Sequence, residues 1–218
     1  LTPYGERYVT YADYTASGRG LYFVERYIRY LLELYANTHT EDDSTGRLTS
    51  RRLAAAEALI KRHLNADESY HLVAVGAGAT AAIERLQQML GIYLPPVTRE
   101  RLGVPAKRDD APVVFVGPYE HHSNEISWRE GFAEVVEIEL DERGTLSLTD
   151  LETKLSDRRW EGREKIGTFS AASNVTGILT DVYAVADMLH RYDARAFFDF
   201  SAAAPYVTID VRRDDDVV

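Results

Sequence analysis

Short, continuous apolar runs separated by helical patterns most constrain the fold of this chain. The predicted strands lie at residues 72–75, 113–116, 134–140, 166–170 and 196–200. Segments with helical periodicity lie between them, at residues 81–90, 149–156 and 182–192. Strands without polar alternation are buried on both faces, as in a parallel sheet covered by helices. The pattern predicts an α/β fold, a three-layer sandwich around a mostly parallel sheet.

The N-terminal part of the chain has a different pattern. Residues 8–14 resemble a strand, and residues 21–35 have the apolar period of a helix. A polar loop over residues 37–49 precedes a second predicted helix at residues 51–64, with Thr49 or Ser50 as its N-cap. The Pro-bearing, charged residues 94–112 are interpreted as a surface insertion. We therefore divide the chain into residues 1–65 and a sheet-bearing domain at residues 66–218.

Charge and composition exclude several classes of protein. The 218 residues contain 25 Lys and Arg against 35 Asp and Glu, a net charge of −10, which argues against binding to a nucleic-acid backbone. The absence of cysteine excludes disulfides and thiolate metal sites within this chain. The longest uncharged apolar stretch, residues 72–83, is too short to cross a membrane. Residues 1–7 do not resemble a secretory signal, and we expect a cytoplasmic protein.

Ligands of open α/β sheets bind beyond the carboxyl ends of the strands, so the residues that follow each strand are the candidates for a site. The first is the glycine-bearing turn at residues 76–80, between a predicted strand and a helix, where free backbone N–H groups can hold a phosphate. The same turn fits the loose dinucleotide pattern G-x-G-x-x-A, so a nucleotide-binding module remains an alternative. A third interpretation is an acidic interaction domain, in which this turn and the three strand-end motifs described next are plain turns.

Three further strand ends carry polar groups. His121 and His122 follow the strand at residues 113–116, and without an H-x-x-x-H pair they predict no metal site; an imidazole there can stack on a ring or carry a proton. Asn174 follows the strand at residues 166–170 and offers an amide donor and acceptor. Asp199 ends a strongly apolar strand, where a carboxylate needs a cation or hydrogen bonds.

Together these segments resemble one family, the class V aminotransferase and cysteine desulfurase branch of the fold-type I pyridoxal 5′-phosphate (PLP) enzymes. The matching motifs in chain order are Y-A-D-Y-T-A-S at residues 11–17, A-N-T-H at 36–39, G-A-T at 78–80, E-H-H-S-N at 120–124, S-N-V-T-G at 173–177 and D-F-S-A at 199–202. The resemblance implies a PLP-dependent transferase or lyase that acts on an amino acid. It also implies a homodimer.

The resemblance further implies roles for individual residues. Ala79 and Thr80 would hold the cofactor phosphate, and His121 would stack on the pyridine ring. Asn174 would bond near the phenolic oxygen, and Asp199 would pair with the protonated pyridine nitrogen. Ala202 occupies the position of the family's cofactor-contacting Gln, as Ala79 occupies that of a Thr, so each lacks a side-chain contact.

The resemblance assigns no catalytic residue to this chain. The family's Schiff-base lysine follows a later strand, and none of Lys61, Lys107, Lys154 and Lys165 lies at the carboxyl end of a predicted strand. Val217 and Val218 are interpreted as the beginning of the strand before that lysine. We therefore expect residues 66–218 to be an incomplete PLP-binding large domain that is truncated before its last strands, lacks the lysine and is inactive alone.

Overall fold

The computed structural model describes residues 2–105 and 109–212, which form two compact units. One unit contains the residues up to 73 and those from 207 onward, and the other contains residues 74–206. The predicted boundary at residue 65 stays a prediction. Lys107, Val217 and Val218 lie outside the described residues. No helix of the described part is long and apolar enough to cross a membrane.

The first unit is built on α1 (Tyr22–Glu33) and α2 (Ser44–His63). The predicted second helix begins too late, because Asp43 caps α2 and accepts a hydrogen bond of 2.7 Å from the Gly46 amide. Bonds from Thr45 and Gly46 hold the pKa of Asp43 below its ordinary value. The strand predicted at residues 8–14 is wrong: among the described residues that segment has no ladder partner, and a strand needs one.

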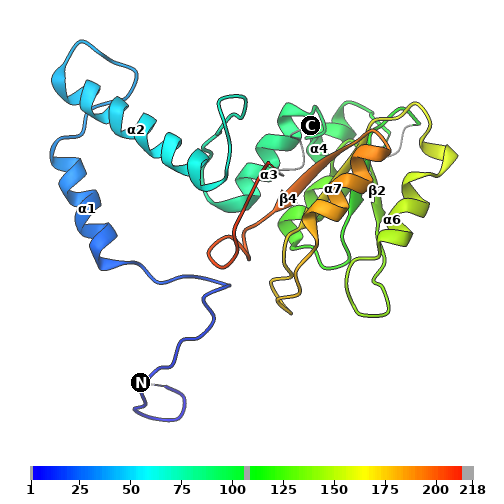
Figure 1. The fold of residues 1–218 in the computed structure, drawn as a ribbon, viewed down its shortest axis with the longest axis horizontal. Coiled ribbons are helices and arrows are strands. Elements are labelled where there is room, and N and C mark those ends of the chain that lie inside the picture. The colour runs from blue at the N-terminus through cyan, green and yellow to red at the C-terminus, as the bar shows by residue number, and fades with distance from the viewer. Residues whose placement is uncertain (1, 106–108, 213–218) are drawn as a thin grey trace. The chain divides into compact units, whose positions relative to one another are not determined.

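The second unit contains a parallel sheet in the order β2-β1-β3-β4 (Figure 1). The strands are β1 (Val113–Val116), β2 (Glu134–Glu137), β3 (Lys165–Ser170) and β4 (Ala194–Asp199). The helices are α3 (Gly78–Met89), α4 (Pro96–Arg101), α5 (Ile126–Glu130), α6 (Leu148–Leu155) and α7 (Val182–Arg191), with short 3-10 turns η1 (His122–Asn124) and η2 (Arg158–Trp160). The strand predicted at residues 72–75 is wrong, because it has no ladder partner in the described part of the chain.

Apolar cores cover both faces of the sheet and explain why β1 lacks polar residues. Val113 and Phe115 pack with Leu151 of α6 and Leu189 of α7, which lie together on one side of the sheet (Figure 1). On the other face, the second core contains Val114 and Val116 of β1, Ile83 of α3 and Trp128 of α5. The predicted α/β fold with a parallel sheet between helices is therefore confirmed.

Candidate functional site

Parallel strands bring the residues after β1, β3 and β4 to one edge of the sheet, which we call the carboxyl edge. Side chains alternate along a strand, so Thr168 and Ser170 of β3 lie on the face that holds Ile166. Phe197 and Asp199 are two positions apart on β4, so their side chains lie on the same face, and Phe197 packs against the core that contains Ile166. The polar ends of β3 and β4 therefore lie on the α3 and α5 side of the sheet.

Glu120 connects the segment after β1 to the end of β3. Its Oε1 accepts a bond of 2.8 Å from the Ser170 amide, and its Oε2 accepts bonds of 2.6 Å from the Ser170 hydroxyl and 2.7 Å from the Asn124 amide group. Burial raises the pKa of Glu120 above its ordinary value, although the bonds from Ser170 and Asn124 act in the opposite direction. The negative charge of Asp199 raises this pKa further. Two acidic groups thus influence each other at the carboxyl edge.

Asn124 extends this network into the core. It is buried, with 1% of its surface exposed, and its Oδ1 accepts a bond of 2.6 Å from the Thr168 hydroxyl. The same oxygen accepts a bond of 3.2 Å from the Trp128 indole N–H. Asn124, Thr168 and Trp128 therefore satisfy one another's buried polar groups, and η1 is held on the end of β3.

The glycine-bearing turn leads directly into α3. Gly78 has φ +77°, a conformation that favours glycine, and an added Cβ at Gly76 or Gly78 would meet no atom within 4 Å. No side chain caps α3, so the N–H groups of its first turn are available to a ligand from this end. Thr80 is exposed in that turn, and its hydroxyl lies 2.6 Å from the Ser123 hydroxyl.

His121 lies beside these groups. It caps η1 through Nδ1, which accepts a bond of 3.2 Å from the Ser123 amide, and its ring is exposed. The Ser123 hydroxyl is 3.0 Å from the same Nδ1. The structure therefore brings together two of the predicted site residues, Thr80 and His121, through a serine that the sequence prediction did not single out.

Asp199 also lies at the carboxyl edge, where its Oδ1 accepts a bond of 2.8 Å from the Ser201 amide and a second bond from the Ser201 hydroxyl. Among the described residues no Lys, Arg or His forms an ion pair with it. A half-buried carboxylate beside the acidic Glu120, without a basic partner in the described residues, suits a cationic ligand group.

The remaining predicted residues are less connected. Asn174 is exposed in the turn after β3, and in the described part of the chain its side chain makes no hydrogen bond. Ala79 and Ala202 are half-buried and contribute only backbone groups. The structure does not connect these three side chains to Thr80, His121 or Asp199.

Sequence reasoning overlooked the residues that hold the predicted ones in place. Glu120, Ser123, Asn124 and Ser170 make the bonds that fix η1 between α3 and β3. Two features of the sequence point to them. Thr168 and Ser170 are two positions apart near the end of β3, so their hydroxyl groups lie on the same face of the sheet, and acidic Glu120 follows β1, the neighbouring strand.

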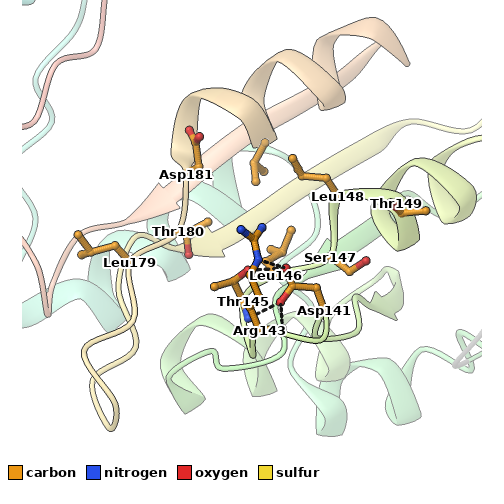
Figure 2. Close-up of a pocket in the computed structure, with 11 residues that line it drawn as sticks. Asp141, Arg143, Thr145, Leu146, Ser147, Leu148, Thr149, Leu179, Thr180 and Asp181 are labelled. Carbon is orange, nitrogen blue, oxygen red and sulfur yellow. Dashed lines mark hydrogen bonds and ion pairs between the residues drawn. The ribbon is translucent and has the colours of Figure 1, made fainter.

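A cavity of about 350 Å³ lies elsewhere, between the loop after β2 and the beginning of α7. Figure 2 shows Asp141, Arg143 and Thr145 gathered in it, with Thr180 and Asp181 on the α7 side. Several of its polar groups bond to one another or to the fold, since Asp141 accepts a 2.8 Å bond from the Thr145 hydroxyl and Thr180 donates one of 2.6 Å to the Ser170 carbonyl. None of the predicted site residues lines it.

Comparison with known proteins identifies the family. Residues 11–215 match the family model described as aminotransferase class-V, so the chain belongs to the class-V aminotransferase family. A probable cysteine desulfurase of Halalkalibacterium halodurans is 26% identical over 209 residues, which cover 94% of this chain and 47% of that protein. A cysteine desulfurase of Synechococcus elongatus is 23% identical over 196 residues, which cover 88% of this chain and 28% of that protein.

Solved structures agree on the fold. A NifS-like protein from Rickettsia africae superposes with a TM-score of 0.68 at 17% identity, covering 91% of this chain and 49% of that one. The fold is that of PLP-dependent transferases. The chain spans about half the length of the first curated relative, 47%.

Proposed function

We propose that this chain holds PLP at the carboxyl edge and takes part in the transformation of an amino acid, of the aminotransferase or cysteine desulfurase type. Family membership and the names of the two curated relatives support this proposal. The observation that carries it is Asp199, a strand-end carboxylate beside acidic Glu120 that has no basic partner among the described residues. Asp199 would pair with the protonated nitrogen of the pyridine ring, which would be its missing cationic partner.

The other residues fit the rest of the cofactor. The uncapped first turn of α3 and the Thr80 hydroxyl would donate hydrogen bonds to the phosphate. The exposed ring of His121 would offer a flat surface to the pyridine, and the exposed Asn174 amide would donate to the phenolic oxygen. When bound, PLP supplies an electron sink that makes the α-carbon proton of an amino acid removable. Asp199 strengthens that sink because its negative charge keeps the ring nitrogen protonated.

We also propose that the lysine to which the family attaches PLP is none of Lys61, Lys107, Lys154 and Lys165, and that the 218-residue chain alone is inactive. Lys165 lies at the amino end of β3, opposite the carboxyl edge, and donates to the Tyr192 carbonyl at 2.8 Å. Lys154 pairs with Asp150 at 2.8 Å. Borohydride reduction after incubation with PLP should label no lysine stoichiometrically. One lysine labelled fully and protected by pyridoxamine 5′-phosphate would contradict this.

Calorimetric titration with pyridoxamine 5′-phosphate tests the binding proposal. This probe is an amine and cannot condense with surface lysines. We expect saturable binding to one site, weakened about tenfold in Asp199→Asn, which keeps the shape but loses the charge; this corresponds to about 1.4 kcal/mol. Asp193→Asn, an exposed change at the other end of β4, serves as the matched control and should bind as the wild type does.

Two results would overturn the proposal. One is the absence of saturable binding, and the other is equal binding by Asp199→Asn and the wild type. Saturable binding of ATP or NAD by a chain that does not bind pyridoxamine 5′-phosphate would instead support the nucleotide-binding alternative.

A further inference from the structure

Thr80, Ser123 and His121 form a row of hydrogen-bonding side chains that joins α3 to η1. The Thr80 and Ser123 hydroxyl oxygens are 2.6 Å apart, and the Ser123 hydroxyl is 3.0 Å from Nδ1 of His121. The row begins at an exposed hydroxyl in the first turn of α3 and ends at an exposed imidazole. These two ends are the groups to which the proposed function assigns the phosphate and the ring of the cofactor.

The donor and acceptor of each hydrogen bond in the row follow from how many protons each group can donate. The Ser123 amide donates to Nδ1 of His121, which assigns a lone pair to that nitrogen and the ring proton to Nε2. The Ser123 hydroxyl therefore also donates to Nδ1. Because a hydroxyl has one proton, Ser123 must accept from Thr80. The Thr80 proton thus points toward Ser123, away from a ligand.

An unprotonated phosphate oxygen only accepts, so a phosphate bound to Thr80 through such an oxygen requires this proton. The Thr80 hydroxyl must then turn, which leaves its oxygen as an acceptor facing Ser123. The Ser123 proton turns toward Thr80 and leaves Nδ1 with the amide bond alone. We propose that the Ser123 hydroxyl is a positioning group that couples phosphate binding at Thr80 to the hydrogen bonding of His121; this inference rests on the proposed function.

The surrounding frame allows the protons to turn while the backbone stays in place. Gln87 of α3 is fully buried and donates a bond of 2.7 Å to the Ser127 hydroxyl, which donates one of 3.2 Å to the Ser123 carbonyl. These bonds hold α3 and η1 together independently of the hydroxyl row. Ala79, next to Thr80, brings no hydroxyl, so Ser123 supplies a second one near the first turn of α3.

Nitrogen NMR of the imidazole tests the coupling at constant pH, with inorganic phosphate and then pyridoxamine 5′-phosphate as probes. Binding of either probe is followed by the amide chemical shifts of residues 78–80. In the wild-type chain we expect the His121 Nδ1 resonance to move to higher chemical shift as this binding approaches saturation. A nitrogen acceptor that loses a hydrogen-bond donor shifts in that direction. In Ser123→Ala the Nδ1 resonance should already lie near the higher chemical shift before any probe is added, and it should not respond to the probes. Ser123→Thr, which keeps a hydroxyl, should restore the response.

Controls separate this inference from the proposed function. Ser156→Ala removes an exposed hydroxyl elsewhere in the same unit and should leave the response unchanged. If the probes shift the amides of residues 78–80 but Nδ1 does not move, or moves equally in Ser123→Ala, the coupling is wrong while the phosphate site stands. If neither probe shifts those amides, the proposed function fails and the coupling fails with it.

Discussion

Glu120 is the residue that holds the carboxyl edge together, and its charge state should affect stability. Its two carboxylate oxygens accept hydrogen bonds from the Ser170 amide, the Ser170 hydroxyl and the Asn124 amide group, so three donors fix one side chain. Burial nevertheless makes ionisation unfavourable and raises the pKa of Glu120 above its ordinary value of 4.5. The folded state therefore holds this proton more strongly than the unfolded state does.

The pH dependence of stability follows from that difference. Below pH 4.5 Glu120 is protonated in both states, and above it the unfolded state loses the proton first. The contribution of Glu120 to the free energy of unfolding thus falls as pH rises from about 4.5 to the folded pKa. Urea denaturation between pH 4 and 7 should show wild type losing stability relative to Glu120→Gln over this window. A constant difference between the two proteins would contradict the raised pKa.

Gly117 leaves the space that the Glu120 carboxylate occupies. A Cβ at Gly117 would clash with Oε1 of Glu120, and that oxygen cannot move away cheaply because Glu120 is held by its three donors. Gly117→Ala should therefore lower the free energy of unfolding by about 1–3 kcal/mol, measured by urea denaturation. Gly76→Ala, where no atom lies within 4 Å, is the control and should change it by less than about 0.5 kcal/mol. Equal changes in the free energy of unfolding for Gly117→Ala and Gly76→Ala would contradict this, because they would show that the Glu120 side chain moves aside at little cost.

Among the elements, η1 depends on Asn124 for its attachment to β3 and α5. Asn124→Ala removes the acceptor of the Thr168 hydroxyl and of the Trp128 N–H, together with one donor to Glu120. Leaving buried polar groups without partners should cost about 1–3 kcal/mol of unfolding free energy. Asn174→Ala, at an exposed asparagine without a side-chain bond in the described residues, should cost less than about 0.5 kcal/mol. Similar denaturation midpoints for the two variants would contradict this role.

The elements that sequence predicted well are those whose local pattern and tertiary environment agree. The apolar run of β1 was found with its correct bounds because both of its faces are buried, and α7 was found because its apolar residues repeat at helical spacing. Residues 8–14 and 72–75 have strand-like composition, but composition does not supply a ladder partner. The beginning of α2 was misplaced because Asp43, not Thr49 or Ser50, accepts the first amide.

For the site, sequence predicted the strand ends but not the bonds between them. Thr80, His121 and Asp199 were recognised by their positions after apolar strands or in the glycine-bearing turn. Ser123, which contacts both Thr80 and His121, could not be predicted as their partner because the contact of α3 with η1 joins residues 43 positions apart. Such distant pairs depend on tertiary packing and leave no periodic signal.

For the whole molecule, we propose that the carboxyl edge of this member of the class-V aminotransferase family binds the phosphate and ring of a pyridoxal cofactor. The most direct test is the change in backbone amide chemical shifts of the 218-residue chain during titration with pyridoxamine 5′-phosphate. We predict saturable shifts at residues 78–80, 121–123 and 199–202, with amides around the cavity beside Arg143 unchanged. Saturable shifts confined to other residues, or no saturable shifts, would contradict it.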